Sequence, residues 1–439
     1  MSSEAVCRPP TGTTYLCVGQ DLFSVNEYVT SQYNYSLHVD INSTTEKEID
    51  VSDKTHHLSV SDFVPSAFMV YTDLQTLRGL WSATDYGSGI QSADGLLDLF
   101  PSIDHSQTAA SAGLQIGLWL NGTEGCLSIC EGDLDDQIDQ LITYLENSRA
   151  SKIFLRLGYE FDNPSFGYSD HPEMYILAFQ KIVSECRKGL SAEAQDRVIF
   201  VWHSWGAPMA SAKLNLHSFY PGDAYVDWIG VSIFQQVFSW SPSWGGQVSD
   251  VENVLKFARE HNKPTMIAES TPFGGIELKQ ASDAAKESIN GTSDPWDRWY
   301  GQVIDIIEKY DVAMWCYINC DWESQPQWHN VGFGETRLSS NREVMTKWHE
   351  QIMSGKSNRT FLQLGALDNC GSTPVSSNLG SDSDHWFTPV HFLSFILVPF
   401  IVASAAFFLP YYMLGGIRGR DRSTKRERRL LLADINEKL

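Results

Sequence analysis

Basic residues are scarce in this chain of 439 residues: 32 Lys and Arg stand against 54 Asp and Glu, a formal net charge of −22. Such an excess of negative charge repels nucleic acid and anionic membrane surfaces, so neither is expected to bind the main body. The balance reverses only near the end, where residues 414–439 hold eight Lys or Arg and four Asp or Glu.

Motifs of three other functional classes are missing. No G-x-S-x-G elbow is present, and the adjacent His203 and Ser204 cannot easily face each other, which argues against a serine hydrolase. Cys126 and Cys130 have no second cysteine pair and no His-x-x-x-His to complete a zinc site. No glycine-rich turn for a nucleotide follows the first apolar run. No metal or other cofactor is therefore expected.

Charged residues are also absent from residues 390–413, an apolar run long enough to cross a bilayer. The basic cluster at 414–439 follows at once, which predicts a single-pass type I helix with a cytoplasmic tail. The large acidic part would then face the extracellular or lumenal side of a plasma or secretory-pathway membrane. The alternative is a buried core helix. Residues 1–7 lack a secretory leader, so we expect that the natural chain begins upstream.

Several features of the proposed outer part suit an oxidising, glycosylating compartment. The eight cysteines predict disulfides, among them a local bond between Cys126 and Cys130, whereas Cys17 and Cys316 either bond or pack as thiols. Residues 361–389 are rich in Ser, Asn, Gly and Asp and predict a flexible stalk. Asn-X-Ser/Thr triplets predict glycosylation at Asn34, Asn42, Asn121, Asn290 and Asn358.

Short apolar runs alternate with longer segments along residues 1–360. Eight such runs begin near residues 14, 66, 114, 153, 197, 226, 264 and 312, and amphipathic stretches at 133–147, 172–189, 250–261 and 294–310 predict helices between them. This alternation predicts an α/β fold, a (β/α)8 TIM barrel. Residues 31–64 are too long for a plain crossover, and their alternating pattern predicts an inserted hairpin.

Two of the predicted strands, the fourth and the seventh, end in a glutamate. Residues 153–157 lead to Glu160, and residues 264–268 lead to Glu269. A barrel gathers the carboxyl ends of its strands around one mouth, and two carboxyl groups there are what a retaining glycosidase requires. Glu160 is the predicted acid/base and Glu269 the predicted nucleophile. For either glutamate alone, a structural ion pair is the alternative.

Polar and aromatic residues near other strand ends are predicted to bind sugar. Aromatic rings stack on the apolar faces of sugars, while amides and carboxylates bind the hydroxyl groups. Some of the strand tryptophans are expected to fill the barrel core instead. The predicted substrate-binding residues are Arg156, Tyr159, Asp162, Trp119, His203, Trp205, Gln235, Trp315, Tyr317, Asn319, Asp321 and Trp322.

These motifs resemble those of clan A, the retaining (β/α)8 glycoside hydrolases, and within it glycoside hydrolase family 26, the β-mannanase-like group. In that family an arginine stands four residues before the acid/base, as Arg156 does before Glu160. Residues 226–230 resemble its sixth strand, and residues 263–269 resemble its nucleophile strand. The resemblance covers roughly residues 14–350 in short motifs.

Two positions depart from the family. It usually has His directly before the acid/base, where this chain has Tyr159, and a Tyr that supports the nucleophile, where this chain has Phe234. The resemblance implies a retaining hydrolase of a β-linked poly- or oligosaccharide, which the apolar run and the basic tail would anchor to a membrane with the barrel on the extracellular side. Because a phenyl ring cannot donate a hydrogen bond, the alternative is an inactive barrel that binds glycans or a protein partner.

Overall fold

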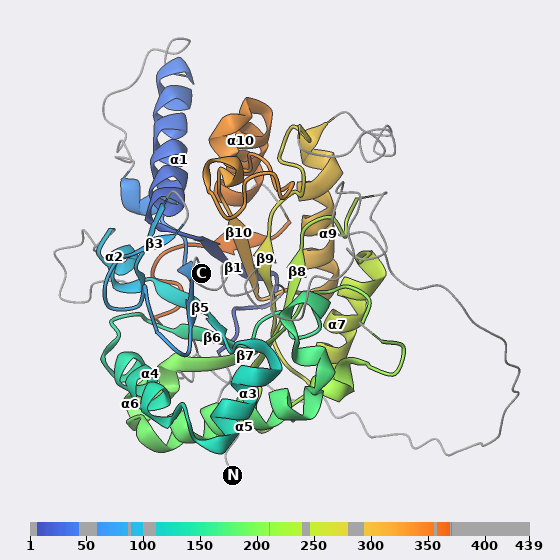
Figure 1. Ribbon diagram of the computed structural model, residues 1–439. Helices are drawn as coiled ribbons and strands as arrows, with labels where there is room; N and C mark the ends of the chain where they lie inside the picture. Colours follow the sequence, from blue (N-terminus) through green and yellow to red (C-terminus); the bar gives the residue numbers. More distant parts are fainter. Residues whose placement is uncertain are drawn as a thin grey trace, which may run out of the picture. The chain divides into compact units, whose positions relative to one another are not determined.

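Eight parallel strands lie side by side in the order of the sequence and close into a barrel, because the last strand pairs with the first (Figure 1). The computed structural model describes residues 7–43, 59–86, 89–99, 111–209, 211–238, 246–279, 294–354, 358–368 and 370. The predicted (β/α)8 barrel is thereby confirmed. Its strands are β1 (Thr13–Gly19), β2 (Ala67–Asp73), β5 (Gly113–Trp119), β6 (Ile153–Leu157), β7 (Val198–Ser204), β8 (Trp228–Ile233), β9 (Thr265–Ser270) and β10 (Met314–Ile318).

Helices surround the strands, and the four predicted helical segments are all present. Asp250 lies in the first turn of its helix and completes a capping box with Gln247, and Asp294 accepts a hydrogen bond from the Trp296 amide at 2.8 Å. The helices after β2 are α2 (Ala93–Leu99), α3 (Gly122–Glu131), α4 (Asp135–Asn147), α5 (Pro172–Gly189), α6 (Ala192–Arg197), α7 (Val248–Glu260), η6 (Trp296–Tyr300), α9 (Gly301–Tyr310) and α10 (Arg342–Trp348).

Helix α1 (Leu22–Ser43) replaces the first part of the predicted inserted hairpin, so that prediction is wrong for residues 31–43. Its many Val, Thr and Tyr residues favour strands, but the spacing of its buried residues is helical and tertiary packing overrides the propensity. Residues 44–58 lie outside the described part of the chain. The buried positions described on α1 are Ser24, Val25, Tyr28, Val29, Gln32 and Ser36.

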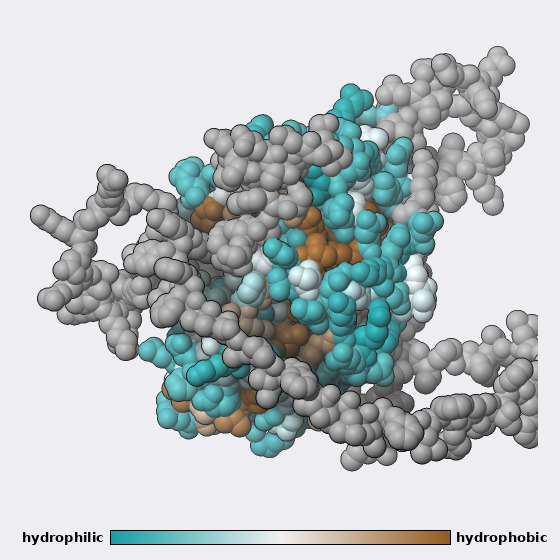
Figure 2. Space-filling view, turned by 90° about the vertical axis from the view of Figure 1, so that its right-hand side faces the viewer, coloured by the Kyte–Doolittle hydropathy of each residue, from teal (hydrophilic) through white to brown (hydrophobic). Residues whose placement is uncertain are grey.

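Successive strand residues pack into two different buried layers. Along β10, Met314 and Cys316 face the barrel interior, whereas Trp315 and Tyr317 pack in the layer between barrel and helices. This alternation is the ordinary two-residue period of a strand. On the outside of the molecule, the face turned toward the viewer in Figure 2 is mostly hydrophilic where described residues are visible.

A short carboxyl-terminal strand, β11 (Thr360–Leu362), pairs in parallel with β1 at Thr13–Tyr15, whereas β2 pairs with β1 further along, at Cys17–Gly19. Phe361 and Leu367 are buried, so residues 361–368 belong to the barrel body, and the predicted flexible stalk is wrong for them. Cys370 forms a disulfide with Cys7. The rest of the predicted stalk lies beyond the described residues.

The other described cysteines are free thiols. Cys126 and Cys130 lie on α3, where residues four apart hold their Cβ atoms about 5–6 Å from each other. A disulfide requires roughly 3.5–4.5 Å between Cβ atoms, so the predicted local bond is wrong. Cys17 and Cys316 lie opposite each other on β1 and β10 as buried thiols, the second of the two predicted alternatives.

No helix in the described part of the chain is both long and apolar enough to span a bilayer. The predicted membrane helix at residues 390–413 and the basic tail at 414–439 lie outside that part. Both stay predictions.

We expect the disulfide to stabilise the barrel by restraining the unfolded chain. Replacing Cys7 and Cys370 together by serine should lower the free energy of unfolding by about 2–4 kcal/mol, measured by urea denaturation. Cys130→Ser, which removes a free thiol of intermediate exposure, is the matched control. Equal denaturation midpoints for the double variant and this control would contradict the expectation.

Candidate active site

Glu160 is presented by a sharp turn at the carboxyl end of β6. Gly158 and Glu160 both have left-handed backbone angles, with φ of 56° and 51°, and such a conformation is uncommon for a glutamate. The side chain of Glu160 is buried within the mouth, with 5% of the residue exposed. Its two oxygens accept hydrogen bonds from Ser232 Oγ at 2.6 Å and from Asn163 Nδ2 at 3.2 Å. The carboxyl group is therefore held in one orientation.

Glu269 reaches the barrel interior because β9 contains an irregularity. The register between β8 and β9 shifts after Val231, so that Ser232 lies opposite Glu269 and Ala268 is the extra residue. Ala268 packs in the interior, and strict alternation would turn Glu269 toward the helices. Instead, Glu269 forms an ion pair with the interior residue Arg156. The Ala268 carbonyl accepts a hydrogen bond from Gln115 Nε2 at 2.8 Å, which satisfies it at the irregularity.

The two carboxyl groups and a histidine converge at one place. An oxygen of Glu160, an oxygen of Glu269 and a ring nitrogen of His203 all lie within 4.8 Å of one another. The three residues come from β6, β9 and β7, the fourth, seventh and fifth strands of the barrel. Retaining glycosidases hold their two carboxyl groups about 5–5.5 Å apart, whereas inverting enzymes hold them roughly 6.5–9.5 Å apart. The observed spacing agrees with the shorter class.

Arg156 occupies the floor beneath the carboxyl groups and is fully buried. Its guanidinium carbon lies 5.1 Å from the ring centroid of Tyr71 and 5.2 Å from that of Tyr159, within cation–π range. Gly117 on the neighbouring strand makes room, because a Cβ there would lie 2.7 Å from Arg156 Nη2. The buried cation is thus paired with Glu269 and enclosed by aromatic rings.

A continuous hydrogen-bonded chain joins the two glutamates. Arg156 Nη1 bonds both Glu269 Oε1 and, at 3.1 Å, His203 Nδ1; His203 Nε2 lies 3.0 Å from Ser232 Oγ, which donates to Glu160. Burial and the Arg156 charge hold the pKa of His203 well below its usual value, so the ring is neutral. Because Arg156 can only donate, Nδ1 of His203 accepts, and Nε2 carries the proton that it donates to Ser232.

The same groups could offer three ligand atoms to a cation. However, the Arg156 guanidinium already bonds both Glu269 and His203, and its positive charge would oppose a metal ion at that point. The arrangement therefore fits proton transfer and nucleophilic attack better than metal binding.

Burial and the neighbouring negative charge of Glu269 raise the pKa of Glu160 to about 8. The hydrogen bonds from Ser232 and Asn163 act in the opposite direction, because they stabilise the ionised form. At neutral pH the Glu160 carboxyl therefore holds a proton that it can donate. Glu269 lies beside it and forms an ion pair with Arg156.

Five of the predicted substrate-binding residues lie near the two glutamates along the chain or in space. Tyr159 packs between Tyr71 and Trp119, with ring centroids 5.6 and 5.9 Å away. Trp119 Nε1 is buried and has no hydrogen-bond partner among the described residues. His203 belongs to the hydrogen-bonded chain that joins the two glutamates. It is fully buried and therefore does not line an open surface. Trp205 is partly exposed, and Gln235 is buried just beyond β8.

Asp162 has a structural position. Its carboxylate is buried and accepts hydrogen bonds from Ser204 Oγ and from the Trp205 amide, both at 2.6 Å. Burial raises its pKa to about 6. The residue ties the loop after β6 to the end of β7, and its predicted contact with substrate stays a prediction.

Three predicted substrate-binding residues on or just after β10 point elsewhere. Trp315 and Tyr317 are fully buried in the outer layer, where both rings pack against Trp348, because alternate residues of β10 face the helices. Asn319 is also buried, and its amide donates to Glu27 Oε2 at 2.6 Å and to the Ser24 carbonyl at 3.2 Å. Their predicted contacts with substrate are therefore corrected.

The other two predicted substrate-binding residues in this part of the chain, Trp322 and Asp321, follow β10 directly. Trp322 is buried, stacks on Phe333 with ring centroids 4.4 Å apart, and donates from Nε1 to Thr336 Oγ1 at 3.1 Å. Asp321 is partly exposed and lies 3.4 Å from Arg337. The ring of Phe234, which stands where the family has a tyrosine, packs edge-on against Phe333.

Of the predicted glycosylation sites, Asn34 and Asn358 are exposed and Asn121 is partly exposed. Asn290 and the side chain of Asn42 lie outside the described part.

Ser232 is a site residue that the sequence did not indicate. Its only signal was its place at the end of the sixth strand, next to the predicted supporting position at Phe234.

Changing the neighbours of Glu160 should move its titration in opposite directions. Ser232→Ala removes a hydrogen bond to the ionised carboxylate and should raise the titration midpoint by about one pH unit, whereas Glu269→Gln removes a negative charge and should lower it. Carbon-13 NMR of labelled glutamate side chains measures both. Ser184→Ala, whose exposed hydroxyl on α5 donates to the Gln180 carbonyl, is the control. An unchanged midpoint in both test variants would refute this description of the site.

Two curated proteins match the chain in sequence. A β-1,3-xylanase from Alcaligenes sp. is 27% identical over 341 residues, which cover 73% of this chain and 66% of the relative. The β-1,3-xylanase TXYA from Vibrio sp. is 28% identical over 334 residues, covering 72% and 66%. The chain thus spans less than two thirds of the length of either relative.

No protein-family model matches the chain. Among solved structures, the catalytic domain of the family 26 endo-β-1,4-mannanase from Bacillus sp. JAMB-750 aligns with a TM-score of 0.43 and 13% identity, over 80% of this chain and 95% of that one. The relatives found by sequence are glycoside hydrolases. The likeness to clan A glycoside hydrolases that the motifs indicate is thereby confirmed.

Proposed function

We propose that this protein is a retaining glycoside hydrolase that cleaves a β-linked polysaccharide. The observation that carries the proposal is the convergence of Glu160 and Glu269 from two strand ends to within 4.8 Å, with the pKa of Glu160 raised to about 8. One carboxyl group then holds the proton that the leaving oxygen needs, and the other is an ionised nucleophile. Because both sequence relatives are named β-1,3-xylanases, β-1,3-xylan is the first substrate to test.

The hydrogen-bonded chain supports a change in the role of Glu160 during the reaction, from general acid to general base. In the first step Glu269 attacks the anomeric carbon, while Glu160 protonates the departing oxygen. The new glycosyl–Glu269 ester has no negative charge, which removes one cause of the raised pKa of Glu160. Glu160 then becomes a better-ionised carboxylate, ready to take a proton from the attacking water. The Ser232 hydroxyl would stabilise this ionised form.

One observation favours a second function, that of a glycan-binding protein without catalytic activity. Phe234 occupies the position at which the family has a tyrosine that supports the nucleophile, and its ring packs on Phe333. Tyr159 is near enough to Glu269 for the carboxylate to raise its pKa further above the value that burial sets. If no hydroxyl supports the nucleophile, a barrel of this shape would serve as a glycan-binding protein without turnover.

The test compares the full chain with two glutamate variants. Glu269→Gln should abolish release of reducing ends from β-1,3-xylan, because an amide is a poor nucleophile. Glu160→Gln should lower the rate by about 10²–10⁴-fold, and less on an aryl glycoside whose leaving group departs without protonation. Glu308→Gln changes an exposed glutamate on α9 and should have no effect. A folded parent that releases nothing from a panel of β-linked xylans, mannans and glucans, yet binds one of them, would favour the binding protein.

We further propose that the barrel is anchored by residues 390–413 and faces the extracellular or lumenal side. The apolar run followed by basic residues supports this orientation, as does the exposed triplet at Asn358. Protease added to intact cells should remove the barrel and leave the basic tail protected. The released fragment should lose mass when treated with an N-glycan-cleaving enzyme. An intact, unglycosylated barrel in the cytosol would contradict the proposed topology.

A further inference from the structure

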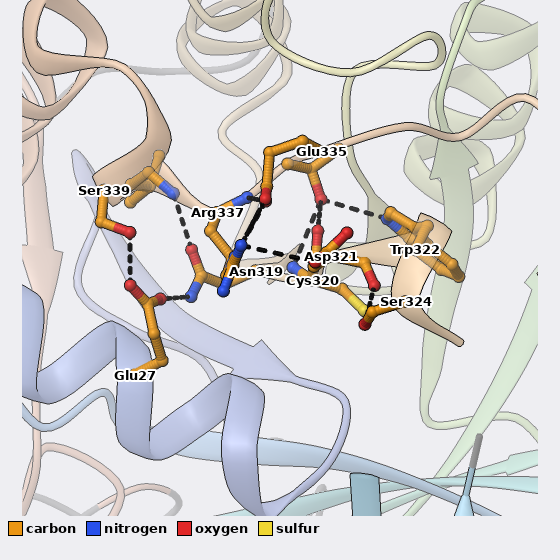
Figure 3. A network of polar contacts seen from close by, with 11 residues as sticks. Glu27, Asn319, Cys320, Asp321, Trp322, Ser324, Glu335, Arg337 and Ser339 are labelled. Carbon is orange, nitrogen blue, oxygen red and sulfur yellow. Dashed lines mark hydrogen bonds and ion pairs between the residues drawn. The ribbon is translucent and has the colours of Figure 1, made fainter. Parts of the chain in front are cut away.

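A second pocket, with a volume of about 600 Å³, lies between α1 and the loop that follows β10. Its lining includes Asp21 at the end of β1, Phe23 and Glu27 on α1, and Gln325 and Arg337 on the β10 side. Figure 3 shows the polar network that forms one wall. None of these residues belongs to the hydrogen-bonded chain that joins Glu160 to Glu269.

The base of the pocket is a buried, fixed carboxylate. Asp21 is 1% exposed and accepts hydrogen bonds from the amides of Phe23 at 2.8 Å and Ser24 at 3.0 Å, and from Ser24 Oγ at 2.8 Å. Gly89 closes over it, because a Cβ at that position would lie 2.7 Å from the Asp21 carboxyl carbon. A larger residue than glycine would therefore displace this carboxylate.

Gln325 supplies the signal that the pocket takes a ligand. The residue is 2% exposed, and its amide nitrogen lies 2.9 Å from Cys320 Sγ and 3.4 Å from Asp21 Oδ2. Its oxygen, which is buried at the pocket, has no hydrogen-bond partner among the described residues. A buried acceptor without a donor is unfavourable, so a hydroxyl group from a ligand would be bound favourably there.

The rest of the lining defines the class of ligand. The Phe23 ring is 58% exposed at the pocket, an unusual position for a large apolar side chain and a suitable platform for a sugar face. Arg337 is already paired with Glu335 and Asp321, so it offers little free positive charge. With Asp21 and Glu27 also present, the pocket repels anions. A neutral sugar with several hydroxyl groups fits this combination.

The wall shown in Figure 3 is held rigidly. Glu27 accepts hydrogen bonds from Asn319 Nδ2 at 2.6 Å and from the Ser339 hydroxyl, and the Leu338 amide donates to Asn319 Oδ1 at 2.9 Å. Helix α1 and the segment after β10 are thereby fastened to each other. The pocket is preformed, which lowers the entropic cost of binding.

We infer that this pocket is a distal sugar-binding subsite, which holds a neutral residue of the same polysaccharide chain whose bond is cleaved between Glu160 and Glu269. The inference rests on the proposed function. Its geometry follows from the order of the strands: β9, which carries Glu269, pairs with β10, and β10 pairs with β1, whose end carries Asp21. Both sites therefore lie on the carboxyl-end rim, two strands apart, where one extended chain can occupy both.

The test measures how affinity depends on chain length. Calorimetric titrations use the full chain in a Glu269→Gln background, to prevent turnover, with β-1,3-linked xylobiose and xylopentaose. Phe23→Ala and Gln325→Leu should each weaken xylopentaose binding by about tenfold and should lower the ratio of pentaose to biose affinity. Leu177→Ala, which removes an exposed apolar side chain on α5, is the matched control and should change neither. Thermal unfolding of each variant verifies that it folds.

The outcomes separate this inference from the proposed function. If the parent cleaves β-1,3-xylan while Phe23→Ala and Gln325→Leu bind xylopentaose as tightly as the control, the subsite is refuted and the hydrolase stands. If the parent cleaves no glycan but binds xylopentaose through Phe23, the hydrolase is refuted, and with it the claim that the bound chain is cleaved, while the pocket stands only as a sugar-binding site. Calcium chloride that binds in a manner abolished by Asp21→Asn, with no sugar bound there, would show a cation site instead and would overturn the inference.

Discussion

The buried ion pair between Arg156 and Glu269 is the interaction on which the rest of the site depends. A guanidinium with no exposed surface is costly unless it is paired, and Glu269 supplies the charge that compensates it. The rings of Tyr71 and Tyr159 enclose the cation, and Gly117 leaves the space that it fills. The pair also orients what lies beyond it: the second contact of Arg156 fixes the tautomer of His203, which fixes Ser232, which holds Glu160.

The irregularity in β9 makes this ion pair possible. An unbroken strand would alternate Met266 inward, Ile267 outward, Ala268 inward and Glu269 outward, away from Arg156. The shift at Ala268 turns the glutamate inward and brings Ser232 opposite it. Gln115 then compensates the disturbed backbone by donating to the Ala268 carbonyl. The site is thus a local departure from a regular barrel, supported by polar side chains that the interior of a barrel would otherwise not contain.

Much of the architecture followed from sequence because it depends on local pattern. The apolar runs that end in Glu160 and Glu269 predicted the fourth and seventh strands, and α5 was predicted with the bounds it has. The direction of individual side chains was harder to infer, since it depends on how the barrel closes. Trp315 and Tyr317 lie on a correctly predicted strand but point to the helices, and strand position alone does not distinguish the two faces.

Features that depend on contacts between residues far apart in sequence were also missed, because a local pattern does not reveal such contacts. The β-branched residues of α1 suggested a hairpin, although the spacing of its buried residues was already helical. Residues 361–368 begin a stretch that is rich in Ser, Asn, Gly and Asp as a whole, and they were predicted as part of it. Their own residues are mostly apolar, and pairing with β1 together with the Cys7–Cys370 bond makes them part of the barrel. The hydrogen-bonded chain through Ser232 joins three strands that are separated in sequence, so no local motif reveals it.

The central claim is that Glu269 is the nucleophile, that Arg156 orients it, and that Glu160 donates a proton to the leaving oxygen. The most direct test is to trap the intermediate: the protein is incubated with a 2-deoxy-2-fluoro-xylobiosyl fluoride, digested and analysed by mass spectrometry. The account predicts a covalent sugar adduct on the peptide that contains Glu269, and no adduct in Glu269→Gln. An enzyme that turns over xylan but carries the adduct on another residue, or that releases a product of inverted configuration, would contradict it.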